Sequence, residues 1–237
     1  MSRIISKKTY LAILLLASLS AMGLIFTNML NQLGCEGQYI NYNTLPSDHI
    51  QIWDDIVAGQ SFVAQQNNLN RVDLLFHTYW RTNTKDIIIT LMEMSDANTY
   101  PESTLLLHQT TFNAAILRNE SWYSFIFPNI SNSQGKTYLI TVKSPTSYEG
   151  NAITLGGIDT DVYPMGTTFL TGILVPNQEF TFRICYAMTI GEKIQRLSHQ
   201  ITNDRPMAWG TVLFYILLFG LYALLLPLFI WQLVKIL

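Results

Sequence analysis

A run of 29 residues without a charged side chain, residues 206–234, constrains this chain more than any other feature. About 20 consecutive apolar residues are enough for a helix to cross a bilayer, and a helix satisfies its own backbone hydrogen bonds in lipid. Trp209 and Trp231 lie near the two ends of the run, where the headgroup layer favours amphipathic rings. The run therefore predicts a transmembrane helix over residues 207–234, followed by a cytoplasmic end at residues 235–237.

A second apolar run predicts another transmembrane helix over residues 9–31. Three basic residues lie in segment 1–8, and basic residues beside a span favour its cytoplasmic side. A cleaved signal peptide is an alternative, although the run is longer than the usual apolar region of about 7–15 residues. Lipidation is another alternative, because residues 32–35 resemble a bacterial lipobox, but Gln32 stands where leucine is usual. The preferred prediction is a two-pass protein of the plasma membrane with both ends cytoplasmic and the central domain outside.

The central part of the chain, residues 36–190, consists of short β-type segments separated by Asn, Ser, Gly and Pro. The part before residue 52 is polar and turn-rich and is interpreted as a connection. Nine segments are predicted as strands: 60–64, 69–81, 86–94, 104–112, 122–127, 136–143, 153–155, 169–174 and 179–188. No helical stretch of the kind that joins parallel strands separates them. The pattern predicts a mainly β fold, an antiparallel β-sandwich of jelly-roll or Greek-key type flanked by the two membrane helices, with a strand near its start pairing with one near its end.

Segment 191–205 has a different pattern from the strands. Ile194, Leu197 and Ile201 recur at helical spacing, with charged and polar residues between them. This predicts an amphipathic connector between the sandwich and the second span. The connector either lies on the outer membrane surface or packs under the sandwich, and both alternatives stay open.

Two cysteines, Cys35 and Cys185, are present in the chain. By the predicted topology both lie outside the cytosol, where a disulfide is chemically permitted. The sequence does not establish whether their Cα atoms come within about 7 Å, so a disulfide and two separate buried thiols are equal alternatives.

No catalytic set is recognisable in the sequence. The four histidines fit no helix-borne metal motif, and no nucleophile elbow or phosphate-binding loop occurs. Asp159 and Asp161 are weak candidates for a Ca²⁺ site, and Asp54 with Asp55 is a second carboxylate pair, but solvated loop residues explain both. The formal net charge of -2 provides no basic field for nucleic acid. These observations favour a non-enzymatic protein without a cofactor.

A ligand-binding face is predicted on the second side of segment 69–81, because flat aromatic rings beside hydrogen-bonding groups suit sugars. The candidate side chains are His77, Tyr79, Trp80, Arg81, Asn83 and Trp53. Ordinary sheet packing with a polar rim is the alternative. Asn119 and Asn129 begin glycosylation sequons, which matter only in a host that glycosylates exported proteins.

Four stretches, GQSFVAQQNNLNRVDLLF, RTNTKDIIITLME, FIFPNISNSQGKTYLITVKSP and NAITLGGIDTDVYPMGTTFLTG, resemble a bacterial extracytoplasmic jelly-roll domain. That domain occurs beside membrane spans in cell-envelope, glycosyltransferase-like membrane proteins. The residues that carry the resemblance are Gln60, Phe62, Leu69, Arg81, Gly135, Lys136, Tyr138, Tyr163 and Gly166. The resemblance implies fold and location rather than activity, and this chain has only two predicted spans and no transferase domain.

These features lead to one expected function and two alternatives. The expectation is a non-enzymatic accessory or structural subunit of a larger membrane complex, whose outer β-sandwich interacts with proteins. Its partners would be the lipid bilayer and either other membrane proteins or further copies of the chain. The first alternative is a carbohydrate-binding module for envelope polysaccharide, and the second is a hydrolase that uses Asp54 and Asp159.

Overall fold

The computed structural model describes scattered residues between 9 and 27, and then residues 33–37, 49–95, 105–159, 163–202 and 212–236. The chain divides into two compact units. One unit is Cys35–Ala187, which contains all the strands, and the other combines Met1–Gly34 with Met188–Leu237. Each unit is described separately below.

The first unit is mainly β. Its strands are β1 (Cys35–Gly37), β2 (His49–Ile52), β3 (Val57–Val63), β4 (Leu69–His77), β5 (Asp86–Met94), β6 (Leu105–Asn113), β7 (Ser121–Ile130), β8 (Thr137–Lys143), β9 (Ile153–Ile158), β10 (Thr168–Leu170), β11 (Ile173–Val175), β12 (Glu179–Phe180) and β13 (Phe182–Tyr186). Two short 3₁₀ helices, η1 (Ala114–Ile116) and η2 (Glu149–Asn151), lie in the connections.

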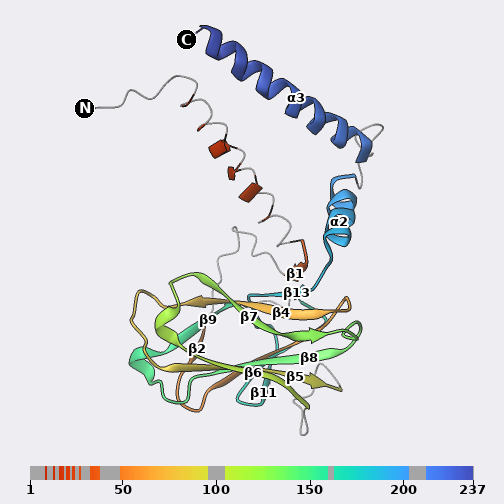
Figure 1. Cartoon of the computed structure of the whole chain (residues 1–237). Helices are drawn as coiled ribbons and strands as arrows, with labels where there is room; N and C mark the ends of the chain where they lie inside the picture. The colour runs from red at the N-terminus through yellow and green to blue at the C-terminus, as the bar shows by residue number, and fades with distance from the viewer. Residues whose placement is uncertain are drawn as a thin grey trace, which may run out of the picture. The chain divides into compact units, whose positions relative to one another are not determined.

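The strands form two antiparallel sheets that face each other across one core (Figure 1). The six-stranded sheet has the order β11-β10-β3-β8-β5-β6. The seven-stranded sheet has the order β1-β13-β4-β9-β12, with β2 also paired to β9 and β7 to β4. Phe62 of β3 and Phe182 of β13 lie on different sheets, and their ring centroids are 6.1 Å apart. The predicted mainly β, antiparallel, two-layer fold is therefore confirmed.

Gln60 of β3 links the two sheets through its buried carboxamide. Its Oε1 accepts hydrogen bonds from Thr168 Oγ1 at 2.7 Å and from the backbone N–H of Phe180 at 2.9 Å, and its Nε2 donates to the Glu179 carboxylate at 2.9 Å. A buried polar group is stable only when hydrogen-bonded, and this one satisfies both ends of its amide. Gln60 thus has a structural role.

The outer strands of the chain lie side by side, as expected. β1 pairs with β13, which is the last strand, and Cys35 lies directly opposite Cys185. Leu69, at the start of β4, is paired with Tyr186, at the end of β13, whereas His77 at the other end of β4 is paired with Thr154. The chain therefore enters and leaves the sandwich at one end, and β4 runs from that end to the opposite one.

Several expectations about strands were wrong. Residues 36–51 are not simply a connection, since they contain most of β1 and most of β2. Segment 169–174 is a hairpin of two strands, β10 and β11, with positive φ angles at Thr171 and Gly172. β7 continues past Pro128 to Ile130, because a register shift in its pairing with β4 lets a residue without an N–H lie within an edge strand.

The second unit contains helices α2 (Ile190–Thr202) and α3 (Val212–Ile236), and helical residues also occur between Thr9 and Thr27. The helix predicted in the connector is therefore present as α2. Within the described ranges, no helix combines the length and the hydropathy that a membrane span requires.

Candidate functional site

The sequence-predicted binding residues lie around a tight turn and not along a strand. β4 ends at His77, and the backbone N–H of Arg81 donates to the Thr78 carbonyl at 3.0 Å, which closes a four-residue turn over residues 78–81. Its two central residues, Tyr79 and Trp80, have φ angles of 50° and 60°. Positive φ at both central positions is the feature of a type I′ turn, where Asn-Gly is the usual pair. This segment is called the aromatic turn below.

The prediction that the strand continues to Arg81 was wrong for this reason. The alternation of apolar and polar residues continues through Arg81, but the extended backbone stops at His77. The side chains beyond it therefore project from a loop at the end of the sandwich.

Exposure separates the two aromatic residues of the turn. Trp80 is 89% exposed and Tyr79 is 43% exposed. The Tyr79 ring is near two side chains: the His77 ring, with centroids 6.1 Å apart, and the Arg81 guanidinium, whose Cζ is 5.5 Å from the ring centroid. Burial raises the pKa of the Tyr79 phenol, the nearby Arg81 charge lowers it, and Glu120 raises it. The phenol is thus neutral at physiological pH.

Asn119 holds the aromatic turn in place. From the sequence, Asn119 was identified only as the start of a glycosylation sequon. Its Oδ1 accepts hydrogen bonds from the backbone N–H groups of Thr78 at 3.0 Å and Tyr79 at 2.8 Å. Asn119 lies in a second tight turn, where Glu120 also has a positive φ of 53°. The contact joins positions 40 residues apart in the chain, so no local sequence signal indicates it.

Asn83 and Trp53 belong to the supporting loops at the same end of the sandwich. Asn83 is buried, donates to the Asn151 carbonyl, and accepts from the backbone N–H of Lys85 at 2.8 Å. Trp53 is half-buried and its carbonyl accepts from the N–H of Ile56 at 3.1 Å. Asn83 therefore supports a loop instead of facing a ligand.

The carboxylates considered for metal or acid–base chemistry do not form a described cluster. Asp54 and Asp55 are exposed in the turn between β2 and β3, and Asp159 is exposed just after β9. Asp161 lies outside the described residues, so the Ca²⁺ prediction stays untested.

A shallow groove with a volume of about 310 Å³ lies between β6 and β7. Its lining includes His108, Phe127, Asn129 and Lys136. None of the residues predicted to bind a ligand lines it, so the groove and the aromatic turn are separate features.

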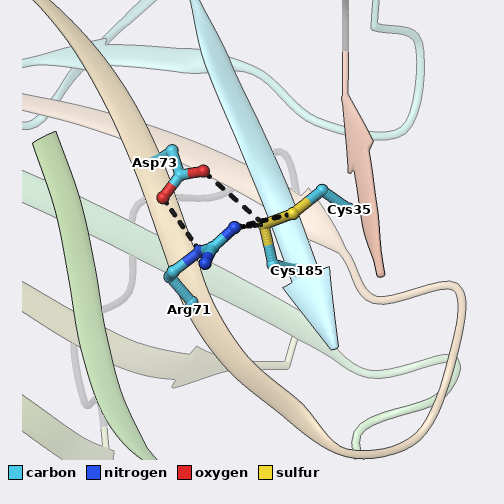
Figure 2. The surroundings of a disulfide bond; sticks show 4 residues. All are labelled: Cys35, Arg71, Asp73 and Cys185. Carbon is cyan, nitrogen blue, oxygen red and sulfur yellow. Dashed lines mark hydrogen bonds and ion pairs between the residues drawn. A yellow bond between two sulfur atoms is a disulfide. The ribbon is translucent and has the colours of Figure 1, made fainter. Parts of the chain in front are cut away.

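The two cysteines form a disulfide at the other end of β4 (Figure 2). Arg71 of β4 points at both sulfur atoms, with its Nη2 2.9 Å from Cys35 Sγ and 3.1 Å from Cys185 Sγ. Its Nε forms an ion pair with Asp73 Oδ1 at 3.0 Å. Arg71 and Asp73 alternate along β4 and so share a face, and the pairing of β4 with β13 places Cys185 beside Arg71.

The chain was compared with known proteins. No protein-family model matches it, and no match to it was found among curated proteins.

Proposed function

We propose that this chain is a non-enzymatic, membrane-anchored protein whose β-sandwich lies outside the cytosol and binds another protein as an accessory subunit of a membrane assembly. The observation that supports this most directly is the aromatic turn, where Trp80 is 89% exposed at a positive φ. Two consecutive bulky residues in a left-handed conformation cost about 1–2 kcal/mol each. The indole is too exposed to repay that cost by internal packing.

An exposed tryptophan on a well-held turn suits a protein interface. Tryptophan, tyrosine and arginine are the residues most enriched among interface hot spots, and all three occur within residues 79–81. The two hydrogen bonds to Asn119 hold the backbone in one conformation before a partner binds, which reduces the entropy lost on binding. The turn is therefore suited to insert into a partner's pocket.

The membrane part of the proposal rests on the sequence. Two long runs without charge, at residues 10–34 and 206–234, flank the sandwich. Several residues of both runs lie outside the described part of the chain. Two spans exceed what simple tethering needs, which supports a role within the membrane layer of a complex.

We also assign the sandwich to the jelly-roll type that it resembles, on the basis of its two antiparallel sheets.

The test is gentle detergent extraction of the full chain from its native membrane, followed by size analysis and mass spectrometry. We expect a stoichiometric complex for the wild type and its loss in Trp80→Ala. Ile173→Ala, which removes an exposed side chain from β11, is the matched control and should keep the partner. A lone monomer, or a complex that survives Trp80→Ala unchanged, would refute the proposal.

A carbohydrate-binding module is the second candidate, and the surroundings of Tyr79 favour it. A half-exposed phenol ring beside an imidazole and a guanidinium combines an aromatic surface with polar groups, which is a combination that suits sugars. In this case Tyr79→Ala and Trp80→Ala should both abolish glycan binding without loss of the fold. Absence of binding to any envelope glycan at millimolar concentration would rule the module out.

A further inference from the structure

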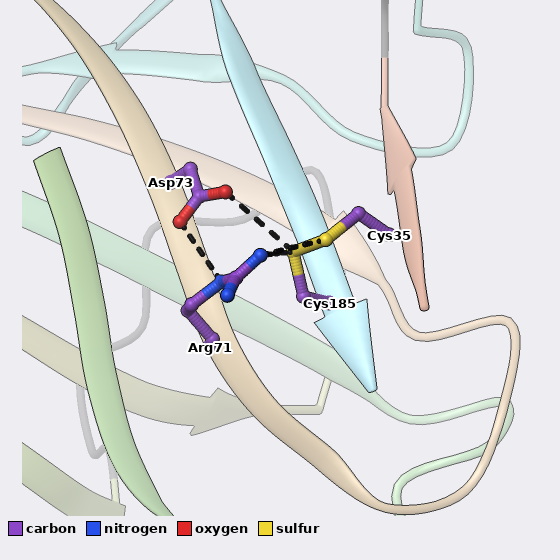
Figure 3. Close-up of polar contacts among 4 residues, drawn as sticks. All are labelled: Cys35, Arg71, Asp73 and Cys185. Carbon is purple, nitrogen blue, oxygen red and sulfur yellow. Dashed lines mark hydrogen bonds and ion pairs between the residues drawn. A yellow bond between two sulfur atoms is a disulfide. The ribbon is translucent and has the colours of Figure 1, made fainter. Parts of the chain in front are cut away.

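We propose that the bond between Cys35 and Cys185 is a thiol–disulfide exchange site, which an external thiol opens in the folded protein by attack on Cys35. The site lies at the end of β4 opposite to the aromatic turn, so it is independent of the binding function proposed above. Figure 3 shows the four residues involved, with Arg71 and Asp73 both directed at the sulfur pair.

The two cysteine residues differ in exposure. Cys35 is half-buried in β1, a three-residue strand whose pairing, within the described residues, is to β13 alone. Cys185 is 3% exposed and lies between β1 and β4 in the sheet. An attacking thiol needs access to one sulfur along the S–S axis, and Cys35 at the sheet edge is the reachable one.

Arg71 provides the charge that an exchange reaction uses. A disulfide sulfur is a poor hydrogen-bond acceptor, so a neutral disulfide makes little use of a guanidinium within 3.1 Å. A thiolate, however, is strongly stabilised by a nearby arginine. Because Nη2 lies close to both sulfurs, it faces the leaving thiolate of Cys185 and also the thiolate of Cys35 after full reduction.

Asp73 makes the site asymmetric. Its Oδ2 lies 3.7 Å from Cys185 Sγ, and the residue is 4% exposed. A disulfide sulfur has no proton to donate, so this contact becomes a hydrogen bond only when Cys185 is a thiol. In the reduced protein the buried carboxylate thus accepts from Cys185, and Arg71 stabilises the thiolate of Cys35, which is the arrangement of one nucleophilic and one resolving thiol.

The reaction balances with a dithiol as reductant. A thiolate of the dithiol attacks Cys35 Sγ, the new S–S bond forms, the bond to Cys185 breaks, and Cys185 leaves as a thiolate. The second thiol of the reductant then attacks the mixed disulfide, releases Cys35 as a thiolate and leaves the reductant as a disulfide. Two electrons pass to this chain, one of the two protons of the dithiol ends on Cys185 and the other goes to solvent, because Cys35 remains a thiolate. The chain reacts once per disulfide and not as a turning-over enzyme.

A metal site is the competing interpretation of the same atoms. The donor atoms of Cys35, Asp73 and Cys185 lie within 4.8 Å of one another. The disulfide leaves no thiolate for a metal ion, and the Arg71 guanidinium within 3.1 Å of both sulfurs repels a cation. The charge at the site therefore favours exchange over metal binding.

The experiment treats the full chain in detergent with dithiothreitol under native conditions, quenches it with acid, and counts free thiols by a maleimide mass shift. We expect complete reduction while the circular dichroism of the sandwich is kept. Arg71→Met should slow reduction roughly tenfold, as expected for loss of one charge-assisted interaction. Arg71→Lys, which keeps the charge, should retain most of the rate and covers the case in which the methionine variant fails to fold.

Arg183→Met is the matched control. Arg183 lies two residues from Cys185 on β13, and its guanidinium stacks on Trp122, with Cζ 3.8 Å from the ring centroid. The rate at which the disulfide is reduced in Arg183→Met should equal the rate in the wild type. A disulfide that opens only in denaturant, or equal rates for Arg71→Met and Arg183→Met, would overturn the proposal and leave the bond purely structural.

Discussion

Trp80 holds a left-handed backbone conformation with its indole in solvent. Such a residue lowers stability without packing against the rest of the protein. The hydrogen bonds from the backbone of Thr78 and Tyr79 to Asn119 keep the turn in this conformation. The physical explanation we prefer is that the conformation serves recognition by a partner.

The variant Trp80→Gly tests whether the left-handed conformation at Trp80 costs stability and serves recognition. Glycine removes the left-handed penalty of about 1–2 kcal/mol and adds an unfolded-state entropy cost of about 0.5–1 kcal/mol. We therefore expect the free energy of unfolding to stay equal or rise by up to about 1.5 kcal/mol, while partner binding is lost. Chemical denaturation followed by circular dichroism measures the first quantity.

Tyr148→Gly is the control for Trp80→Gly. Tyr148 is also an exposed aromatic residue, at 60%, but its φ is -138° and glycine relieves no strain there. The free energy of unfolding of Tyr148→Gly should fall by about 0.5–1 kcal/mol. If both glycine variants lose stability equally, the turn at Trp80 is not strained.

Gly166 shows a steric requirement at a single position. A Cβ added to Gly166 would clash with the backbone carbonyl oxygen of Ser61. The segment that contains Gly166 cannot easily move away, because the next residue, Thr167, is hydrogen-bonded to Ser61 of β3. Gly166→Ala should lower the free energy of unfolding by about 1–3 kcal/mol, as overpacking does. Gly191→Ala, in open space within α2, should not lower it. Equal thermal denaturation of the two variants would contradict this prediction.

At the scale of elements, α2 begins with a reciprocal cap. Thr189 Oγ1 accepts from the backbone N–H of Glu192, and the Glu192 carboxylate accepts from the backbone N–H and the hydroxyl of Thr189 at 2.7 and 2.8 Å. The spacing of Thr and Glu is that of a capping box. The bonds to the backbone and hydroxyl of Thr189 lower the pKa of Glu192 below its usual value of 4.5.

This cap makes the start of α2 sensitive to acid. A lowered folded-state pKa means that the carboxylate stabilises the helix above pH 4.5 and that this stabilisation is lost as the pH falls through the folded-state pKa. We expect the Cα chemical shifts of residues 190–193 to move toward coil values as the pH falls below 4.5 and through the folded-state pKa. The Thr189→Ala variant should show a weaker helix start at neutral pH and a smaller change on acidification. Identical titrations of the two chains would exclude the cap as the cause.

At the scale of the whole molecule, the disulfide closes a very long loop. Its two cysteines are separated by 150 positions and join the first strand to the last. Cross-links of this kind stabilise mainly by restricting the unfolded chain, typically by about 2–4 kcal/mol. The bond therefore contributes to the stability of the sandwich whether or not it also exchanges.

Replacing both cysteines by serine tests this contribution. The double variant should keep the β-sandwich, because the shared core is made by other residues, but lose about 2–4 kcal/mol of unfolding free energy. Denaturation of the wild type with and without reductant, beside the double variant, measures the difference. A double variant as stable as the oxidised wild type would show that the cross-link contributes nothing.

Much of the sandwich could be predicted from local patterns. The bounds of β5 match the predicted segment 86–94, because a short run rich in apolar and β-branched residues is bounded there by polar, turn-forming residues. The short strands β1 and β2 were missed because three or four residues carry too little pattern to stand out from a polar connection. The candidate site was predicted only as a set of residues: Tyr79, Trp80 and Arg81 do lie together, but in a turn and not on a sheet face.

The sequence by itself was enough to identify the two charge-free runs and to predict the antiparallel β character of the domain and the helix after it. Each of these features depends on residues close together in the chain. Only the tertiary structure decided that Asn119 holds the turn at Tyr79 and that Arg71 reaches the sulfurs of Cys35 and Cys185. These contacts join positions 36 to 114 residues apart. They depend on which strands become neighbours, and the side-chain period of two residues tells which face of a strand is buried but not which strand lies beside it.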